Sequence, residues 1–492
     1  MASMQQVPAL EDQLLLRTTS YVDGAWEAGD ARKVLSVRNP ATGATIAEVR
    51  TATAADTRRA IEAAYRAFGK WRQTTVKERA GVLRRWYELT VEAAEDLAVL
   101  MTAEQGKPLQ ESRGEIQYGA SFIEWFAEQA KRADGDVFSG ATPHTRAICI
   151  RQPVGVVAAI TPWNFPNAMI ARKVAPALAA GCTVVVKPAE DTPLSALAMA
   201  ELAERAGFPA GCFNVVVGNP VEIGAELTGS PLVRKLSFTG STEVGKLLEK
   251  QCAPTLKRTT MELGGNAPFI VFDDADLDDA IAGALLSKYR NSGQTCVCAN
   301  RFLVQDSIYD EFCDRLVAAS SELVLGDGAD EGVTQGPLIN DEAIGKVSGL
   351  VAESIEAGAE CLMGGKASDL GGCFYPHTVL RNVTPEMSVF RQEVFGPVAA
   401  LTPFADEAEA VRLANDTEAG LCAYVYSRDI GRVWRVAEAL EFGMVGMNEG
   451  IISSEMAPFG GVKASGWGRE GSRYGMDDYM DIKYLCVGGL DR

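Results

Sequence analysis

The sequence predicts an α/β protein with two parallel-sheet domains and a small additional β element. Short apolar runs alternate with helical stretches from residue 155 onward, and a second series of the same kind begins at residue 268. Strands that are apolar throughout and separated by helices are typical of parallel sheets covered on both faces. A chain of 492 residues, 47% of them hydrophobic, is long enough for two or three domains with sizeable cores.

The amino-terminal part of the chain is predicted to be helical. Residues 56–68 and 76–103 carry apolar side chains at spacings of three and four, which is the period of a helix with one buried face. The first α/β series follows these helices. Its expected strands are 155–160, 183–187, 213–217, 235–239 and 259–263, and its expected helices are 168–180 and 194–206.

The second α/β series runs from residue 268 to about residue 445. Its expected strands are 268–272, 300–305, 396–403 and 421–427, and its expected helices are 275–290, 341–357 and 408–415. Residues 479–487 then alternate between apolar and polar side chains, like a strand without a neighbour in the sequence. Such a strand must pair with a distant segment or with another subunit, because it would otherwise be an exposed edge.

Charge and cysteine content limit the possible partners and the compartment. The chain carries 47 basic and 65 acidic side chains, a net charge of −18, which should repel nucleic acids and anionic membrane surfaces. No apolar run reaches the roughly 20 residues of a membrane span, and the start of the chain does not resemble a targeting peptide. Eleven cysteines without a regular framework indicate reduced thiols, so a cytoplasmic protein is expected.

Cys296, in the polar turn of residues 291–298, is the candidate nucleophile. A thiol on a polar connection between a helix and a strand is accessible, whereas a core thiol only packs. A nucleophilic thiol needs a base, and the two histidines, His144 and His377, have no motif around them. Glu262 is the better candidate because it ends a predicted strand and precedes two glycines, which let other backbone segments approach closely.

Three predicted strand ends carry groups suited to a cofactor, since open parallel sheets bind ligands beyond the carboxyl ends of their strands. Gly240 and Ser241 open a helix whose free N–H groups could bind a pyrophosphate. Lys187 and Glu190 could hold ribose hydroxyls, and Glu393 precedes a turn into a strand. A plain helix start and a solvated charge pair are the alternatives for the first two sites.

Six motifs together resemble the aldehyde dehydrogenase superfamily, over nearly the full chain. They are Thr161-Pro-Trp-Asn-Phe-Pro166, Lys187-Pro-Ala-Glu190, Phe238-Thr-Gly-Ser-Thr242, Glu262-Leu-Gly-Gly265, Gly293-Gln-Thr-Cys296 and Glu393-Val-Phe-Gly-Pro397. All six occur in the order of the family, and within it the chain resembles the branch that oxidises succinate semialdehyde. Gln392 stands where the family usually has a glutamate, but Glu393, the position taken to hold the nicotinamide ribose, is kept.

The resemblance implies a more detailed domain organisation. A Rossmann-like cofactor domain would comprise residues 1–137 and 160–266, and a catalytic domain would comprise residues 267–447. Residues 138–159 and 476–492 would form an oligomerisation element, so that the protein would be a homodimer or homotetramer.

The resemblance also implies NAD as the cofactor, with NADP possible. A carboxylate at Glu190 would accept hydrogen bonds from both adenosine-ribose hydroxyls and repel a 2′-phosphate, although Lys187 nearby would soften this preference. No metal is implied. The residues expected to contact the cofactor are Thr161, Pro162, Trp163, Lys187, Glu190, Gly240, Ser241, Glu393 and Phe395.

The resemblance further assigns a role to each catalytic candidate. The Cys296 thiolate would attack the aldehyde carbon, and Asn164 with the backbone N–H of Cys296 would stabilise the oxyanion. Glu262 would then activate water to hydrolyse the thioester, which a carboxylate does best if an apolar site raises its pKa towards neutrality. Lys173 and Glu470 resemble the proton exit path of the family, and the alternative is that both are ordinary surface charges.

Substrate choice is expected to depend on arginines that would bind a carboxylate. Arg172 and Arg290 match the succinate-semialdehyde branch, and Ser453 matches its third carboxylate contact, with Ser454 as the alternative counterpart. Arg172 and Lys173 point about 100° apart on a helix, so they can serve different sites. Either arginine could instead form a structural ion pair. Glutarate semialdehyde remains an alternative substrate, because one more methylene changes burial by only about 0.8 kcal/mol.

Two other classes of function compete with an oxidising dehydrogenase. A reductase of acyl phosphates or acyl-CoA would not need a hydrolytic base, and a non-catalytic relative would be expected to lose the nucleophile or the base. The presence of both Cys296 and Glu262 argues against each of these two classes.

Cys298 is a candidate redox partner of Cys296, since a turn brings two such cysteines close enough for a strained disulfide. Simple packing of Cys298 is the alternative.

Overall fold

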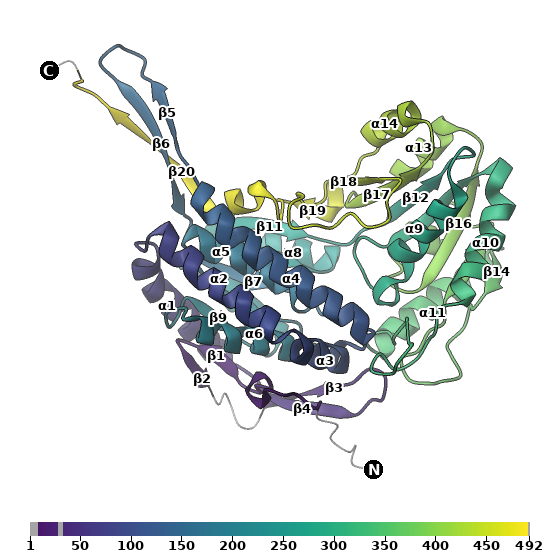
Figure 1. Cartoon of the computed structure of the whole chain (residues 1–492), viewed down its shortest axis with the longest axis horizontal. Helices are drawn as coiled ribbons and strands as arrows, with labels where there is room; N and C mark the ends of the chain where they lie inside the picture. The colour runs from purple at the N-terminus through teal and green to yellow at the C-terminus, as the bar shows by residue number, and fades with distance from the viewer. Residues whose placement is uncertain (1–7, 28–32, 491–492) are drawn as a thin grey trace.

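Residues 8–27 and 33–490, which the computed structural model describes, form two α/β lobes and a protruding β arm (Figure 1). Each lobe is built on a largely parallel sheet with helices on both faces, so the predicted fold class is confirmed. Among the described residues, no helix is both long and apolar enough to cross a membrane.

The sheet of the first lobe has eight strands in the order β19-β11-β10-β7-β8-β9-β1-β2. Strands β7 to β11 are parallel to their neighbours among themselves, whereas β1, β2 and β19 join antiparallel at the two edges. Their bounds are β1 Ser20–Val22, β2 Ala25–Glu27, β7 Val156–Ile160, β8 Thr183–Lys187, β9 Phe213–Val215, β10 Val233–Thr239, β11 Arg258–Glu262 and β19 Gly466–Trp467. A separate ribbon pairs β3 Val34–Arg38 with β4 Thr45–Arg50.

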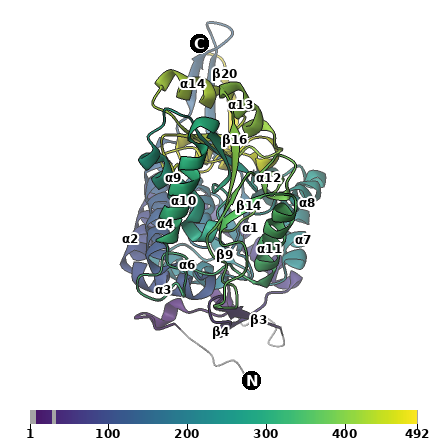
Figure 2. The same ribbon diagram turned by 90° about the vertical axis from the view of Figure 1, so that its right-hand side faces the viewer.

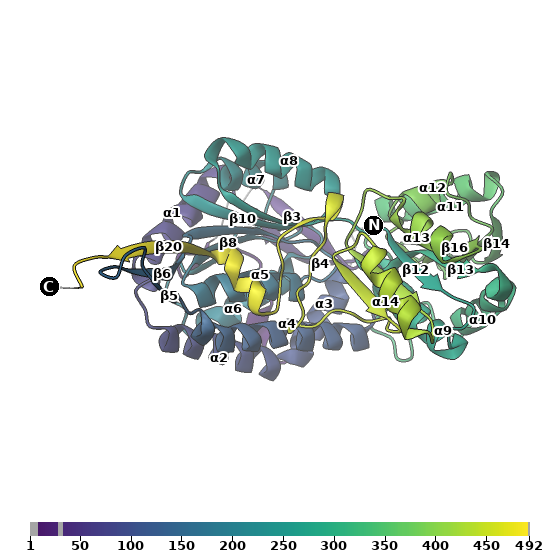
Figure 3. The same ribbon diagram turned by 90° about the horizontal axis from the view of Figure 1, so that it is seen from above.

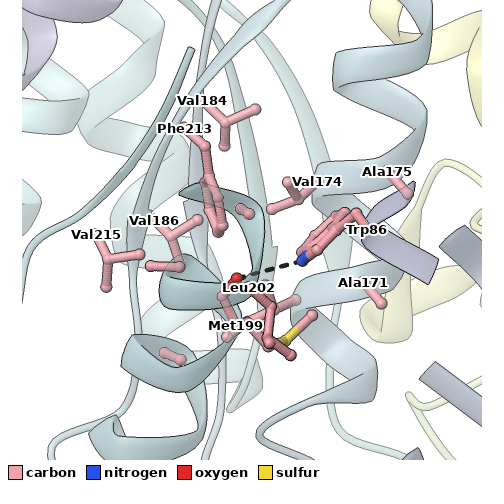
Figure 4. Close-up of a cluster of buried hydrophobic side chains, with 14 of the residues drawn as sticks. Trp86, Ala171, Val174, Ala175, Val184, Val186, Met199, Leu202, Phe213 and Val215 are labelled. Carbon is pink, nitrogen blue, oxygen red and sulfur yellow. Dashed lines mark hydrogen bonds between the residues drawn. The ribbon is translucent and has the colours of Figure 1, made fainter. Parts of the chain in front are cut away.

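Helices α2 to α6 cover one face of this sheet, and α1, α7 and α8 cover the other (Figure 3). Trp86 of α2 is buried on the first face against Phe213 of β9 and donates a hydrogen bond to the Met199 carbonyl (3.2 Å; Figure 4). The helices are α1 Ala54–Trp71, α2 Val76–Glu92, α3 Ala94–Gln105, α4 Leu109–Gln129, α5 Ala168–Ala180, α6 Pro193–Ala206, α7 Pro220–Gly229 and α8 Thr242–Cys252. The prediction of a single helix over 76–103 is therefore wrong. The helix is interrupted at Ala93 (φ −92°, ψ 13°), and the two resulting helices, α2 and α3, each pack on both α4 and α6.

The second lobe has a seven-stranded sheet in the order β14-β15-β16-β13-β12-β17-β18, antiparallel only between β14 and β15. The strands are β12 Ala267–Val271, β13 Ala299–Gln305, β14 Glu360–Met363, β15 Thr378–Arg381, β16 Val398–Phe404, β17 Cys422–Tyr426 and β18 Met444–Met447. Helices α9 and α10 lie on the opposite side of the sheet from α11 and α12 (Figure 2). The helices are α9 Leu277–Tyr289, α10 Tyr309–Ser321, α11 Asp341–Glu356, α12 Ser388–Arg391, α13 Glu407–Asn415 and α14 Ile430–Ala439.

Short 3₁₀ turns connect several of these elements. They are η1 Gln13–Leu15, η2 Ala130–Arg132, η3 Ala253–Thr255, η4 Arg290–Gly293, η5 Asp306–Ile308, η6 Lys463–Ser465 and η7 Arg473–Tyr479.

The arm is a three-stranded antiparallel sheet in the order β20-β6-β5 (Figure 1). Its strands are β5 Asp136–Ser139, β6 Arg146–Pro153 and β20 Met480–Val487. Of the two partners predicted for the last strand, a distant segment or another subunit, the structure shows the first: β20 pairs along its whole length with β6 of the same chain. The other edge of β20 has no strand partner among the described residues.

The division into domains stays a prediction, but two of its expected limits differ from the sheets. β7 begins at Val156, inside the segment 138–159 that was expected to belong to the oligomerisation element, and it lies in the middle of the first sheet. β5 begins at Asp136, within the segment 1–137 expected to bind the cofactor, and it lies in the arm. Both differences arise because sheet membership depends on long-range pairing.

Candidate active site

A cavity of about 810 Å³ is lined by residues of both lobes, including the ends of β10 and β11 and the loop before β13. Most of the side chains singled out from the sequence meet there. Those that line it are Pro162, Trp163, Asn164, Arg172, Gly240, Ser241, Glu262, Arg290, Cys296, Glu393, Phe395 and Ser453. Those that lie outside its lining are Thr161, Lys173, Lys187, Glu190, Cys298 and Glu470.

The loop that presents Cys296 follows an unusual stretch of backbone. Asn291, Ser292 and Gly293 have φ of 51°, 56° and 74°, so three successive residues are left-handed. Such strain on non-glycine residues persists only where neighbouring contacts hold it. The Asn291 side-chain amide supplies one of these contacts by donating to the Asn164 carbonyl (2.9 Å). The strained turn therefore connects the loop of Cys296 with the loop of Asn164.

Hydrogen-bond donors converge on the same side of the cavity as the thiol. Asn164 donates one side-chain N–H to the Gln294 carbonyl (2.9 Å), which leaves the second N–H of its amide available. In the part of the chain that the structure describes, the backbone N–H of Cys296 donates to no protein acceptor. Two donors of this kind, next to a nucleophile, can stabilise an oxyanion.

The half-buried Cys296 thiol is held in its neutral form by its surroundings. Burial and, to a smaller extent, the neighbouring Glu262 carboxylate raise its pKa to about 12 against the opposing charge of Arg172. Thiolate formation therefore needs a base or an additional positive charge close by.

Glu262 is a buried carboxyl group without a protein hydrogen-bond partner at Oε1. It ends β11, where its backbone is paired with Thr239 of β10 on one side and Gly466 of β19 on the other. Burial raises its pKa to about 8, and the negative charge of Glu470 contributes to the rise. A carboxylate with a pKa near neutrality and a free oxygen is suited to act as a general base.

The two glycines after Glu262 allow the approach that the sequence suggested. A Cβ at Gly265 would lie 2.4 Å from the Cys296 carbonyl oxygen, and one at Gly264 would lie 2.6 Å from Oε2 of Glu393. The Gly265 N–H donates to Oε1 of Glu393 (2.9 Å). Larger side chains here would separate the strand of Glu262 from the nucleophile loop.

Glu470 forms a buried charge cluster with two neighbours on α5. Lys173 Nζ pairs with its Oε1, and Arg172 Nη2 lies 2.7 Å from its Oε2. The two cations lower the pKa of Glu470 in spite of its burial. Arg172 lines the cavity and Lys173 does not, in agreement with their different directions on the helix, but both side chains also pair with Glu470, one at each carboxylate oxygen.

Arg172 and Arg290 gather around Tyr118 of α4. The charges of both arginines and the Ser453 hydroxyl lower the pKa of Tyr118, although burial raises it more. Arg290 lies over the Phe165 ring (5.5 Å to its centroid) and forms no ion pair within the described ranges. An unpaired arginine in a cavity with two hydroxyls is suited to bind a carboxylate.

The two serine candidates are separated by the structure. Ser453 lines the cavity, whereas Ser454 does not line it and donates to the Glu455 carboxylate (3.3 Å). Ser453 is thus the counterpart better placed to meet a substrate.

The other part of the cavity lining carries the groups expected to contact a cofactor. The rings of Trp163 and Phe395 meet edge to face at 5.6 Å. Ser241 caps α8 by accepting a hydrogen bond from Val244 N (3.3 Å), so the helix begins where it was predicted. Burial raises the pKa of Glu393 to about 7.

Lys187 and Glu190 form an ion pair with each other (2.6 Å) just outside this lining. Lys187 is buried, whereas Glu190 is partly exposed. Asp191, the next residue, lines the cavity, and its pKa is raised by burial and then by the charge of Glu190. Thr161 is buried, and its hydroxyl has no protein partner.

Cys298 is buried and points its thiol at the Lys288 carbonyl (3.5 Å). Cys296 and Cys298 are both free thiols, as are the remaining nine cysteines. A redox role of Cys298 therefore stays a prediction, and any disulfide would require its side chain to leave this contact.

Several residues that line the cavity were missed by the sequence interpretation. They are Lys107, Glu111, Glu115, Tyr118, Asp191, Lys346 and Phe459. Four of them lie on or beside α4, where helical periodicity indicates which face is buried but not that the face borders a cavity. The one signal in the sequence that could have indicated the cavity was the presence of charged side chains on an otherwise apolar face of this helix. Among the described residues, no cluster of three side chains could hold a metal ion.

Comparison with known proteins agrees with this arrangement. Residues 26–485 match the model of the aldehyde dehydrogenase family. The chain is 59% identical to a glutarate-semialdehyde dehydrogenase of Pseudomonas aeruginosa, over 98% of this chain and 100% of that one. It is 58% identical to an NADP-dependent succinate-semialdehyde dehydrogenase of Escherichia coli, over 97% and 99% of the two chains. The structure is similar to the crystal structure of a succinate-semialdehyde dehydrogenase from Burkholderia pseudomallei, with a TM-score of 0.97 at 60% identity over 98% and 100% of the two chains.

Proposed function

Since the chain belongs to the aldehyde dehydrogenase family and is an NAD(P)-dependent oxidoreductase, we propose that it oxidises succinate semialdehyde to succinate. The observation that carries this proposal is the group of Arg172, Arg290, Ser453 and Tyr118 in the cavity that also contains Cys296. Two guanidinium groups and two hydroxyls match the charge and hydrogen-bonding needs of a carboxylate at the far end of a short aldehyde.

The reaction begins with attack of the Cys296 sulfur on the aldehyde carbon. Asn164 and the Cys296 N–H donate hydrogen bonds to the oxygen that becomes negatively charged. The nicotinamide cofactor, when bound, supplies the hydride acceptor, and its positive charge favours the thiolate. The resulting thioester on Cys296 is hydrolysed by water that Glu262 deprotonates, and Glu470 with Lys173 offers the proton a route away from Glu262.

NAD is the proposed cofactor, with NADP as the alternative. Trp163, Ser241, Glu393 and Phe395 are the side chains that would hold it, and the N–H groups at the start of α8 that the Ser241 cap leaves unbonded suit its pyrophosphate. Asp191 adds a second acidic group beside the carboxylate of Glu190, which further disfavours a 2′-phosphate. The E. coli relative is NADP-dependent, and in this chain Lys187 is the positive charge near Glu190 that would favour NADP.

Glutarate semialdehyde is the second candidate substrate, because the P. aeruginosa relative is a glutarate-semialdehyde dehydrogenase. Initial rates of reduced-nicotinamide formation should be measured with succinic semialdehyde, glutaric semialdehyde and butanal, under NAD and NADP separately. We expect the highest kcat/KM with succinic semialdehyde and NAD. A higher value with butanal would refute the carboxylate site, and a higher value with glutaric semialdehyde or NADP would select the corresponding alternative.

We further propose that the protein is a homo-oligomer assembled through the arm. Ile482 and Tyr484 on β20 are 71% and 61% exposed, and the outer edge of this strand has no partner among the described residues. A strand edge that has no partner and exposes apolar side chains is a site for association. Light scattering should give a dimer or tetramer, and Ile482→Asp should shift it to a smaller species. A monomeric parent protein would contradict the proposal.

The cytoplasm is the proposed compartment. The support is that all eleven cysteines are free thiols, the state maintained in a reducing environment.

A further inference from the structure

A cluster of polar side chains, three of them buried and one half-buried, lies at the junction of α3 and α4, and none of the steps above uses it. We call Gln105, Lys107, Glu111 and Glu115 the α4 brace. Lys107 Nζ lies 2.5 Å from Oε2 of Glu115, and both side chains are 1% exposed. The Lys107 ammonium also lies 4.0 Å from the centroid of the Phe165 ring, so it is enclosed on several sides.

The brace contacts the loop that carries the oxyanion donor. Lys107 Nζ donates a hydrogen bond to the backbone carbonyl of Asn164 (2.8 Å). Glu115 Oε1 accepts from the N–H groups of Asn167 and Ala168 (3.0 and 3.1 Å), where α5 begins. One ion pair thus holds the peptide of Asn164 on one side and the start of the following helix on the other.

The brace also contacts the turn before the nucleophile. Glu111 Oε2 accepts from the Asn291 N–H (2.8 Å), and Gln105 Nε2 donates to Oδ1 of Asn291 (3.0 Å). The other side of the Asn291 amide donates to the Asn164 carbonyl, which is the acceptor that Lys107 also uses. Both loops therefore share one network, and it includes the left-handed residue of the strained turn.

Stability does not explain this arrangement. Replacing a buried ion pair by apolar side chains of similar volume is often neutral or stabilising, so a charged pair is a poor way to fill a core. Burial lowers the pKa of Lys107 and raises that of Glu111, which indicates that both charges are held at a cost. A fully connected polar network does, however, specify one geometry of the groups that it joins.

We propose that Lys107 and Glu115 are positioning residues that fix the peptide of Asn164 relative to the loop of Cys296. They do not touch the reacting atoms, and they act through Asn164. The inference rests on the proposed role of Asn164 as the donor to the oxyanion. Loss of the pair lets the two loops shift, and a donor displaced from the oxyanion contributes little to the reaction.

A double-mutant cycle tests this proposal. Asn164→Ala, Lys107→Met with Glu115→Gln, and the triple variant are compared with the parent protein in a stopped-flow burst of reduced nicotinamide, with succinic semialdehyde and saturating NAD. Removing both charges at once avoids leaving one of them buried and unpaired. We expect Asn164→Ala to slow the burst about 100-fold, and the brace variant to slow it at least about 10-fold, as for loss of an oxyanion donor. In the Asn164→Ala background the brace change should alter the burst less than about 3-fold, because coupled residues are not additive.

Glu104→Gln is the matched control. Glu104 is likewise buried and likewise accepts from two N–H groups at a helix start, those of Leu194 and Ser195 (both 2.8 Å), but it contacts neither loop. We expect its burst rate to stay close to that of the parent, even if its melting temperature falls as much as that of the brace variant. If the brace variant does not fold, Glu115→Gln alone enters the same cycle.

The outcomes separate this inference from the proposed function. An unchanged burst in Asn164→Ala would refute the role of Asn164 and the inference with it. A slow Asn164→Ala combined with an equal brace effect in both backgrounds would refute the inference alone, as would a burst in Glu104→Gln slowed as much as in the brace variant.

Discussion

Replacing Glu262 by glutamine should separate the two halves of the reaction. The substitution keeps the size of the side chain and removes its ability to accept a proton. Formation of the thioester should survive, because the Glu262 carboxylate raises the pKa of the Cys296 thiol and its loss makes the thiolate easier to form. Hydrolysis of the thioester should slow by about 100-fold or more, the usual contribution of a general base.

The pKa of Glu262 sets the pH dependence of the parent protein. With a pKa of about 8, about one tenth of Glu262 is ionised at pH 7 and about nine tenths at pH 9. If hydrolysis limits the rate, turnover should rise roughly tenfold over this interval. Rapid mixing should show a burst of reduced nicotinamide followed by slow turnover in Glu262→Gln, with little pH dependence of the slow phase.

The same substitution should change stability in a pH-dependent way. The pKa of Glu262 in the folded protein lies above its ordinary value of 4.5, so the folded state binds more protons and loses stability as the pH rises through about 8. Glu262→Gln removes this loss. Its melting temperature should therefore exceed that of the parent increasingly between pH 5 and pH 8, and the difference should level off above that range.

Two results would refute this reasoning. A Glu262→Gln protein that turns over at the parent rate would require another base. A parent protein whose turnover and melting temperature show no transition between pH 6 and pH 9 would mean that the pKa of Glu262 is not raised by burial.

The other predictions concern the remaining charged and thiol groups. Glu470→Gln should shift the rise of turnover to lower pH, because the Glu470 charge raises the pKa of Glu262. The substitution should also lower the melting temperature, since two buried cations lose their partner at a cost of about 3–5 kcal/mol. An unshifted pH profile of turnover would contradict this prediction. Arg290→Ala should raise KM for succinic semialdehyde far more than for butanal, with little change in melting temperature. Arg172→Ala should have the same effect on KM and should also lower the melting temperature, because Arg172 pairs with Glu470. An equal rise of KM for both substrates would mean that the arginines have only a structural role. Peroxide should inactivate the enzyme, and dithiothreitol should restore its activity. Recovery should be weaker in Cys298→Ala, because Cys296 overoxidises when it has no partner thiol. Identical recovery in both proteins would exclude a redox role for Cys298.

Features with a local signal were predictable from the sequence. Cys296 lies on a polar turn and Glu262 ends an apolar strand before two glycines, and both signals lie within a few residues of the group concerned. The sequential order of strands and helices in the two lobes was likewise visible as alternating apolar runs, and the structure agrees with it.

Features that depend on long-range packing were not predictable. Ala93 carries no helix-breaking side chain, yet the chain turns there to pack α3 apart from α2. The partner of β20 lies more than three hundred residues earlier in the chain, and periodicity carries no information about pairing. Tyr118 and the α4 brace lie on a buried helix face, and only the assembled lobes turn that face into the wall of a cavity.

The position of Arg172 between the cavity and Glu470 has a consequence for the base. Arg172 lowers the pKa of Glu262, Glu470 raises it, and Lys173 lowers it, so the ionisation of Glu262 depends on how these three charges neutralise each other. A substrate carboxylate at Arg172 adds a negative charge that offsets the effect of the arginine. We therefore expect the rise of turnover with pH to lie at higher pH for succinic semialdehyde than for butanal in the parent protein. In Arg172→Ala the two profiles should move closer together, and identical profiles in the parent protein would show that the substrate carboxylate does not reach Arg172.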